Sequence, residues 1–516
     1  MKEFNITGTC IPDRHFMVDI SKKIQQIMEL VEKGKYFTIN RPRQYGKTTT
    51  LSNLFHKLKN NSDYLIIRTS FEGLGEDKFK TEENFCSTIF YTLSGGLINE
   101  SEEYKESFRT YGISLKKLED VSKAITRFIQ EQNRKVVLMI DEVDKASNHN
   151  LFLNFLGMLR NKYLDRADGN DQTFHSIVLA GVYDIKNLKL KMRPDSESKY
   201  NSPWNIATDF EVDMSFNTKE IAGMLEDYTS TTHIGIDIPL ISQEIYNYTK
   251  GYPFLVSKIC KVVDEKLDKD WSIEGIKHAI NITLENENTL FDDLIKNLEI
   301  HKDLYELVYT ILVDGNRIPF EIYNPLIKLG VTFGILAKQN GATSVSNKIF
   351  EVCIYNYMIS KTLMKEKVFT RSGYIHQFIQ NNKLNMENIL NKFQEIMHDE
   401  YREKDDKFIE REGRLLFLCF LKPIINGVGF YYVESETRED SRMDVVVTFG
   451  NEEHIIELKI WRGKKREDLA LEQLSDYLES KRKTEGYLLN FNFNQKKDYK
   501  KEWVNFMGKK IYRVDV

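Results

Sequence analysis

Residues 36–50 read Tyr36-Phe37-Thr38-Ile39-Asn40-Arg41-Pro42-Arg43-Gln44-Tyr45-Gly46-Lys47-Thr48-Thr49-Thr50, and this stretch decides the fold. A short apolar run ends at Asn40, a loop follows, and Gly46-Lys47-Thr48 opens a predicted helix. A phosphate-binding P-loop needs this order, because the N–H groups of the first helical turn point at the phosphates. The lysine of such a loop reaches the β- and γ-phosphates, and the threonine hydroxyl binds Mg²⁺. We therefore predict that ATP is bound by Arg43, Gln44, Tyr45, Gly46, Lys47, Thr48 and Thr49, with Thr48 as a Mg²⁺ ligand.

The loop departs from the P-loop pattern at one position. Arg41 stands where the pattern has its first glycine, so Gly-Lys-Thr alone is a weak signal. Arg41 and Arg43 flank the loop, and the arginine fork is well suited to phosphate oxygens. Solvated or ion-paired loop arginines fit the sequence equally well, and both interpretations stay open.

A second strand supplies the acidic residues that ATP hydrolysis requires. The run Val136-Val137-Leu138-Met139-Ile140 is typical of a strand buried on both faces, and Asp141-Glu142 follows it directly. An acid at the tip of such a strand can hold Mg²⁺, and a carboxylate beside it can orient the attacking water. Asp141 suits the first role and Glu142 the second. Alone, the pair is also typical of a polar strand end; downstream of a P-loop, it predicts an ATPase site.

Strands and helices alternate over the first part of the chain. Further strands are predicted at 64–68, 176–180 and 210–214, and helices at 20–31, 82–97 and 114–132. This alternation favours a parallel α/β sheet.

The pattern becomes helical after Asn217. Asn217 and Glu220 predict a capping box, and the helices that follow are interrupted at Gly251-Tyr252-Pro253. Residues 301–362 read as two helices, a turn at Gln339-Asn340-Gly341 and a further helix, which suits a winged-helix module. The predicted α/β architecture is a P-loop parallel-sheet ATPase core at 1–216, a helical lid at 217–300, a winged-helix-like module at 301–365, a linker at 366–390 and a small α/β domain at 391–516.

Four stretches together resemble the bacterial AAA-ATPase-like family: Asn40 to Thr50, Ile140 to Asp144, Ser202-Pro203-Trp204-Asn205-Ile206-Ala207 and Gly251-Tyr252-Pro253-Phe254. In that family an arginine-containing loop often replaces the first P-loop glycine, so the resemblance implies that Arg41 is a family trait. It also implies a helical lid and winged helix after the core. Related ATPases place a γ-phosphate sensor where Tyr183 and Asp184 stand here, and an ordinary strand cap is the alternative for these two residues.

A second group of polar residues lies near the end of the chain. Residues 443–449 and 455–461 read as two strands joined by a Gly450-Asn451 turn. Glu457 and Lys459 are two residues apart and point to one face, and Asp444 on the neighbouring strand can meet Glu457. Two carboxylates and a lysine can bind a divalent metal and position a water for phosphodiester attack. A solvated strand face with a Glu–Lys pair is the alternative.

The order of helix acid, strand Asp, strand Glu-x-Lys and helix Gln resembles the PD-(D/E)xK nuclease superfamily, although Met443 replaces its proline. The resemblance implies that Asp444 and Glu457 bind Mg²⁺ or Mn²⁺ and that Lys459 orients or polarises the water. It implies that Glu412 is the helix acid, with Glu410 as the competitor. Gln473 would support the metal site or the scissile phosphate.

Composition limits the partners. A net charge of −4 argues against a uniformly basic nucleic-acid binder. The basic clusters Lys464-Lys465-Arg466 and Lys481-Arg482-Lys483 flank the predicted nuclease site and fit either a phosphate backbone or ordinary solvated surface. Five scattered cysteines, no signal peptide and no long apolar run predict a cytoplasmic protein with no membrane partner.

These observations favour an ATPase whose nucleotide state controls a metal-dependent nuclease-like domain acting on nucleic acid, DNA rather than RNA. By analogy with similar fusions, the setting would be a mobile element or phage defence. One alternative is an ATPase regulator whose last domain binds DNA without cutting it. Another is a signalling switch that acts by nucleotide-driven homo-oligomerisation.

Overall fold

The computed structural model describes residues 2–73, 75–146, 149–182, 206–208, 210–313, 316–365, 378–380, 383–400, 410–425, 429–434, 444–450, 452–460, 464–492 and 499–516. The chain forms two compact units. The first contains Met1–Tyr246, Lys250–Lys261 and Thr332–Gly334, and the second contains Asn247–Thr249, Val262–Val331 and Ile335–Val516. Within the described residues, no helix combines the length and apolar character needed to cross a membrane.

The first unit is an α/β structure. In chain order its elements are β1 (Glu3–Phe4), β2 (His15–Phe16), α1 (Ser21–Glu32), β3 (Tyr36–Asn40), α2 (Lys47–Lys59), β4 (Tyr64–Ser70), the 3₁₀ turn η1 (Glu76–Phe79), α3 (Glu82–Gly95), α4 (Glu102–Thr110), α5 (Leu118–Gln130), β5 (Lys135–Asp141), the 3₁₀ turn η2 (Val143–Lys145), α6 (Asn150–Ala167), β6 (Ser176–Gly181) and α8 (Thr218–Thr232). Helices α9 (Ile238–Thr249) and α10 (Pro253–Lys266) have residues in both units.

The central sheet of this unit is parallel, as predicted, with the strand order β3-β6-β5-β4. The loop strand β3 and the acidic strand β5 are therefore separated by β6. Because all these strands are parallel, their carboxyl ends share one edge, where ligands bind in open α/β sheets. The predicted strand at 210–214 does not form; only Thr208 makes an isolated parallel bridge, to Phe37 on β3.

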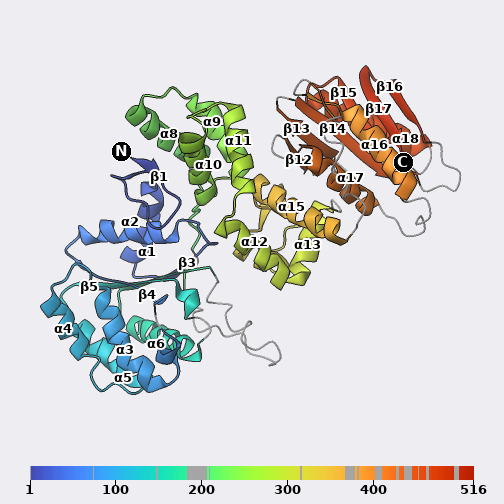
Figure 1. The fold of residues 1–516 in the computed structure, drawn as a ribbon. Coiled ribbons are helices and arrows are strands. Elements are labelled where there is room, and N and C mark those ends of the chain that lie inside the picture. The colour runs from blue at the N-terminus through green and yellow to red at the C-terminus, as the bar shows by residue number, and fades with distance from the viewer. Residues whose placement is uncertain are drawn as a thin grey trace. The chain divides into compact units, whose positions relative to one another are not determined.

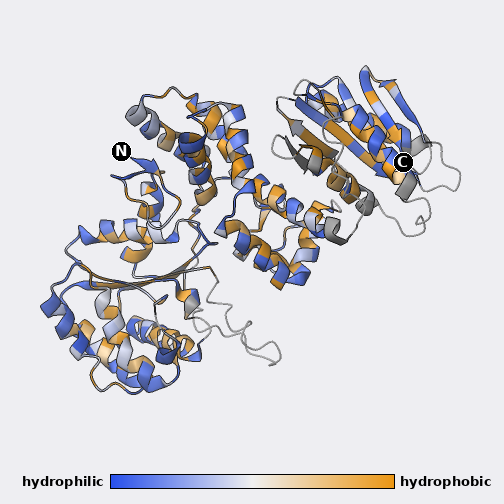
Figure 2. Ribbon diagram, in the orientation of Figure 1, coloured by the Kyte–Doolittle hydropathy of each residue, from blue (hydrophilic) through white to orange (hydrophobic). Residues whose placement is uncertain are grey.

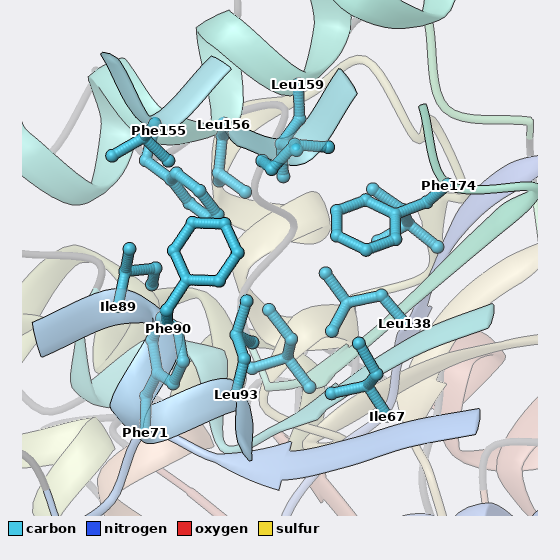
Figure 3. Close-up of a cluster of buried hydrophobic side chains, with 14 of the residues drawn as sticks. Ile67, Phe71, Ile89, Phe90, Leu93, Leu138, Phe155, Leu156, Leu159 and Phe174 are labelled. Carbon is cyan, nitrogen blue, oxygen red and sulfur yellow. The ribbon is translucent and has the colours of Figure 1, made fainter. Parts of the chain in front are cut away.

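Helices cover both faces of this sheet. Figure 1 shows α1 and α2 on one face and α3, α5 and α6 on the other. On the second face, Phe90 of α3 and Phe155 of α6 belong to one buried apolar cluster with Ile67 and Leu138 of the strands (Figure 3). Burying each such side chain contributes about 1.5–3 kcal/mol. The helices alternate hydrophilic and hydrophobic residues along their length (Figure 2), as amphipathic helices do. The packed layers give the loops at the sheet edge a rigid base.

The capping box predicted at the start of α8 is present. Asn217 Oδ1 accepts a hydrogen bond from the Glu220 N–H at 3.0 Å, and Glu220 Oε2 accepts one from the Asn217 N–H at 2.9 Å. The predicted interruption lies between α9 and α10. There Gly251 has φ +73°, and its carbonyl accepts the Phe216 N–H at 2.8 Å.

We expect Gly251→Ala to lower the free energy of unfolding by about 3 kcal/mol. An added Cβ would lie 1.8 Å from the Phe216 carbonyl oxygen, and the backbone conformation disfavours any side chain. Gly223→Ala, inside α8 with open space around its Cβ, is the matched control and should stabilise by about 0.5–1 kcal/mol. Urea unfolding measures both. Equal stabilities of the two variants would contradict this account.

The second unit joins a helical part to a large mixed sheet. Its further elements are α11 (Ile273–Glu285), α12 (Thr289–Ile300), α13 (Lys302–Leu312), β7 (Ile318–Pro319), α14 (Pro325–Thr332), β8 (Leu336–Gln339), β9 (Ala342–Val345), α15 (Lys348–Lys365), β10 (Ile379–Gln380), β11 (Lys383–Leu384), α16 (Met386–Glu400), α17 (Glu410–Ile425), β12 (Gly429–Glu434), β13 (Asp444–Phe449), β14 (Glu452–Ile460), α18 (Lys464–Ser480), β15 (Glu485–Phe491), β16 (Lys501–Phe506) and β17 (Lys509–Asp515).

The segment predicted as a winged helix contains a small sheet of order β7-β9-β8 among α13, α14 and α15. Asn340 (φ +47°) and Gly341 (φ +78°) form the predicted turn between β8 and β9, since a tight hairpin needs two positive φ values. The winged-helix assignment and the five domain boundaries stay predictions. The described part of the predicted linker is not extended chain, because it holds the β10–β11 hairpin and the start of α16.

The large sheet has the order β12-β13-β14-β15-β17-β16. The pairs β12–β13, β13–β14 and β16–β17 are antiparallel, whereas β14–β15 and β15–β17 are parallel. Helix α18 covers one face, where Leu474 and Leu478 pack with Leu488 of β15. The other face carries Phe491, which lies against Phe393 of α16 and Gly413 of α17.

Candidate functional sites

The predicted phosphate loop connects β3 to α2. Gly46 has φ +78° and precedes Lys47, the first residue of the helix, and the Thr50 N–H bonds the Gly46 carbonyl at 2.9 Å. The N–H groups ahead of Thr50 have no carbonyl one turn earlier in the helix, so they suit an anion. This is the local geometry that phosphate binding needs.

Lys47 is buried and held by the loop itself. Its Nζ donates to the Arg41 carbonyl at 3.0 Å and to the Pro42 carbonyl at 2.9 Å. Burial lowers the pKa of Lys47, and the charges of Asp144, Glu142 and Asp141 oppose this shift. Three acids from the β5 end therefore act on the lysine from α2. Phosphate oxygens are stronger acceptors for an ammonium group than carbonyls, so a nucleotide can displace the loop carbonyls.

Arg41 is engaged with the protein and not directed to a ligand. Its guanidinium donates to the Asn40 carbonyl at 2.8 Å and the Val212 carbonyl at 2.6 Å, and it lies 5.1 Å from the Phe210 ring centroid. Of the two interpretations left open for the loop arginines, the structure supports the structural one for Arg41. This arginine ties β3 to the segment at 210–212. Arg43 is exposed and remains a candidate phosphate contact.

The remaining loop residues have distinct surroundings. The rings of Tyr45 and Tyr252 pack edge to face, with 4.7 Å between their centroids. The Tyr252 hydroxyl donates to the Arg43 carbonyl at 2.5 Å. Gln44 has φ +55°. Thr49 Oγ1 accepts the Cys10 N–H at 3.2 Å, so its hydroxyl already has a protein partner. Thr48 is half-buried in the first turn of α2.

The acidic residues lie at the carboxyl end of β5. Asp141 is buried, and its Oδ1 accepts the Glu142 N–H at 2.9 Å. Glu142 is half-buried in the left-handed region with φ +52°. Burial raises the pKa of its carboxyl, and the Lys47 charge opposes the rise. The oxygen atoms of Thr48 and Asp141 are of the type that Mg²⁺ prefers, and Mg²⁺ usually keeps several waters, so this donor set fits the ion.

The C-terminal candidate site is defined by strand register. Asp444 pairs with Glu434 on β12, and Val445 pairs with Ile456 on β14. Position 444 therefore lies one step beyond that pair, opposite position 457. The hairpin places the two predicted metal ligands at one level of the sheet, and oxygen donors there suit a hard divalent cation.

Glu457 and Lys459 are buried and form an ion pair with each other. The solvated strand face that the sequence left open is therefore excluded. Both residues lie on the face covered by α18, because Glu457 pairs with Leu488 and Leu488 packs under that helix. Burying two charges costs desolvation energy that their mutual attraction often does not offset, so stability alone does not explain this pair.

The other residues predicted for the two sites are not part of the buried Glu457–Lys459 pair. Glu412 is on the first turn of α17, next to Gly413, which packs against Phe491 at the carboxyl edge of the sheet. Gln473 is exposed on α18, the helix that covers the face with the buried Glu457–Lys459 pair. Tyr183 and Asp184 lie outside the described residues. Among the described side chains, no group of three or more His, Cys, Asp or Glu is arranged to hold a metal.

One basic cluster is far from the C-terminal site. Lys481-Arg482-Lys483 follows the carboxyl end of α18 and precedes β15, where Lys483 is paired with Glu453 at 3.7 Å. The 17-residue α18 is about 25 Å long, and its amino end is the one that reaches the carboxyl edge, through Glu467 and Arg513. The other cluster, at 464–466, opens α18 at this amino end.

Comparison with known proteins identifies the family. A family model described as an AAA-like domain matches residues 8–355, more than half of the chain. The chain belongs to this family. A second family model, the PD-(D/E)XK nuclease superfamily, matches residues 427–502 and so includes Asp444, Glu457, Lys459 and Gln473. Both resemblances expected from the sequence are confirmed, as is the α/β P-loop architecture.

The individual relatives are distant. An uncharacterized WD repeat-containing protein of Synechocystis sp. is 23% identical over 364 residues, which cover 66% of this chain and 29% of that protein. A Walker-type ATPase of Pyrococcus abyssi gives a TM-score of 0.46 at 12% identity, covering 68% of this chain and 99% of that one. The Aeropyrum pernix ORC1 protein in complex with DNA gives a TM-score of 0.30 at 11% identity. The match covers 67% of this chain and 94% of that one.

The AAA-like domain contains one residue whose role the sequence did not suggest. The Asp144 carboxylate accepts the Val182 N–H at 2.8 and 2.9 Å, which joins the acidic segment to the end of β6. A Cβ on Gly181 would lie 2.2 Å from Asp144 Oδ1, so this approach requires glycine at 181. The glycine directly after an apolar strand is the signal from which such a contact could have been suspected.

Proposed function

We propose that this chain hydrolyses ATP and that its nucleotide state controls a metal-dependent nuclease-like domain that acts on DNA. The observation that supports it best is the convergence of Lys47, from α2, with Asp141, Glu142 and Asp144, from the end of β5. A phosphate-binding lysine facing a cluster of carboxylates is the arrangement that phosphoryl transfer uses. We place the protein in the cytosol, in keeping with its five free cysteines.

At the first site, the N–H groups at the start of α2 and Lys47 would bind the β- and γ-phosphates of ATP. Thr48 and Asp141 would hold the magnesium. Glu142, whose pKa is raised by burial, would orient the attacking water and accept its proton. At both sites Mg²⁺, when bound, supplies positive charge that stabilises phosphate oxygens.

At the second site, Asp444 and Glu457 would hold Mg²⁺ or Mn²⁺. Lys459 would leave its ion pair with Glu457 and orient the water that attacks the phosphodiester. Glu412, near the same edge on α17, would supply a further acid, whereas the exposed Gln473 would act at most on the nucleic-acid side. A role in phage defence or in a mobile element rests on analogy alone.

The test uses the purified full chain with supercoiled plasmid, Mg²⁺ or Mn²⁺, and ATP, ADP or no nucleotide. We expect metal-dependent nicking whose rate differs about fivefold or more between ATP and ADP. A single-stranded RNA substrate in the same buffers tests the preference for DNA.

A specific observation favours a second candidate function. Glu457 and Lys459 neutralise each other, which is what a domain that binds DNA without cutting it would also show. Absence of nicking under every nucleotide and metal condition, with ATP turnover intact, would support this regulator. Light scattering with ATP and ADP then tests the homo-oligomerising switch, and an unchanged monomer would count against it.

A further inference from the structure

A row of buried polar side chains crosses the large sheet beside the candidate nuclease residues. In the register of the parallel strands, Lys459 on β14 pairs with Asn490 on β15, and Asn490 pairs with Asp515 on β17. Their exposed fractions are 5%, 1% and 3%. Charged and amide side chains are this deeply buried only when specific partners hold them.

The partners are known for most of the row. Arg513 donates to Asp515 through Nε at 2.9 Å and through Nη2 at 2.6 Å, which is a bidentate ion pair. Arg513 also pairs with Glu467 at the start of α18. Asn490 Nδ2 donates to Asp515 Oδ1 at 2.9 Å. Arg513 and Asp515 therefore form a fixed base for Asn490.

This contact also fixes how the Asn490 amide is turned. An ionised carboxylate can only accept hydrogen bonds, so the NH₂ group of Asn490 must face Asp515. Its carbonyl oxygen, Oδ1, is then directed away from Asp515. Adjacent strands lie about 4.8 Å apart and Lys459 is the register partner on the other side, so Oδ1 is within reach of the lysine.

A buried ionic network of this kind is weak support for stability, because apolar residues of the same volume often stabilise as well or better. The position of the network, beside the candidate nuclease residues, indicates a role other than stability. It lies at the same sheet level as Lys459, two residues along the strand from Glu457, and on the α18-covered face that both share.

We propose that Asn490 is a positioning residue for Lys459, a role that rests on the proposed nuclease function. A Glu457 carboxylate drawn to a divalent cation can no longer fully neutralise the lysine. Asn490 Oδ1 then accepts a hydrogen bond from the Lys459 ammonium group and holds it at the catalytic edge, while Asp515 and Arg513 hold Asn490. The network thereby lowers the cost of separating Glu457 from Lys459.

The test measures Mn²⁺ binding to the nucleotide-free full chain by isothermal titration calorimetry, with Glu457→Gln defining the signal that does not come from this site. Asn490→Leu keeps the branched shape of the side chain and removes the acceptor. We expect it to weaken Mn²⁺ binding about tenfold or more, because the variant removes the acceptor that takes the lysine when Glu457 is drawn to the cation. It should also lower the kcat of DNA cleavage with little change in KM. ATP turnover by the same preparation reports that the chain is folded.

Two further variants sharpen the result. Asn391→Leu removes an amide that bonds the Tyr512 hydroxyl at 2.8 Å from α16 on the other face, and it should leave Mn²⁺ affinity unchanged. Asn490→Ser is a smaller polar change that should fold if Asn490→Leu does not, and it should weaken binding about threefold or more.

Native Mn²⁺ affinity in both Asn490 variants would overturn the positioning role and leave the proposed nuclease site intact. No Mn²⁺ binding by the native chain beyond the Glu457→Gln background would overturn the metal site itself, and the role of Asn490 with it.

Discussion

Glu142→Gln should lower the rate of ATP hydrolysis by about 10²- to 10⁴-fold and leave ATP binding intact. The carboxylate lies beside Asp141 at the end of β5, half-buried, with its pKa raised by burial and lowered again by Lys47. A base with a raised pKa accepts a proton from water more readily, and the amide that replaces it cannot accept one. Because the side chain keeps its shape, the phosphate loop is undisturbed.

Phosphate release measures turnover, and equilibrium binding of a fluorescent ATP analogue measures affinity. Lys47→Ala should differ from Glu142→Gln in ATP binding. It removes the phosphate contact, so it should lose ATP binding as well as turnover. Glu72→Gln is the matched control, because Glu72 is an exposed acid whose charge also raises the pKa of Glu142. It should leave turnover close to native. Turnover retained in Glu142→Gln would remove Glu142 from the mechanism, and turnover retained in Lys47→Ala would overturn the phosphate loop assignment.

The pH dependence of ATP turnover follows from the raised pKa of Glu142. The base must be deprotonated, so turnover is lost on the acid side as the pH falls through the raised pKa of Glu142. The loss should begin at higher pH than for an ordinary glutamate. Glu142→Gln should remove this limb from the pH profile of any residual activity.

The four strands of the central sheet were predictable because each contains a short apolar run, whereas the two-residue strands β1 and β2 were not predicted. Buried parallel strands have no polar face, so Val136–Ile140 stands out in the sequence and is found as β5. Helix α4 was not predicted, since Phe108 is its one fully buried residue and the rest of its sequence is polar. The segment at 210–214 reads as a strand but forms none. Thr208, ahead of it, makes an isolated bridge to Phe37 of β3, and Arg41 bonds the Val212 carbonyl.

The candidate sites were predictable where the chemistry is local in sequence. Gly46, Lys47 and Thr48 are adjacent, and Glu457 and Lys459 are two residues apart on one strand. The remaining residues depend on which strands become neighbours. Asp144 gains its partner only because β6 lies beside β5, and Asn490 meets Lys459 only through the β14–β15 register. Strand order is set by the packing of the whole sheet, and no short stretch of sequence contains it.

Lys459→Ala should lower metal-dependent DNA cleavage by about 10²- to 10³-fold, as removal of a preorganised group at a charged transition state does. ATP turnover should be unchanged, because the phosphate loop belongs to the other compact unit. Cleavage of supercoiled plasmid and phosphate release, measured on one preparation, separate the two activities. The variant also leaves the 2% exposed carboxylate of Glu457 without its cation, which should cost about 3–5 kcal/mol of stability.

This loss of stability could by itself abolish cleavage, so the decisive variant removes both charges. Glu457→Gln with Lys459→Met replaces the ion pair by uncharged groups of similar volume, and such replacements are often neutral or stabilising. If Glu457 and Lys459 perform the chemistry, the double variant should unfold at native or higher urea concentration and still cut no DNA. If the pair is structural, the double variant should cut DNA at the native rate. The structural interpretation and the catalytic one thus predict opposite results in a protein of equal stability.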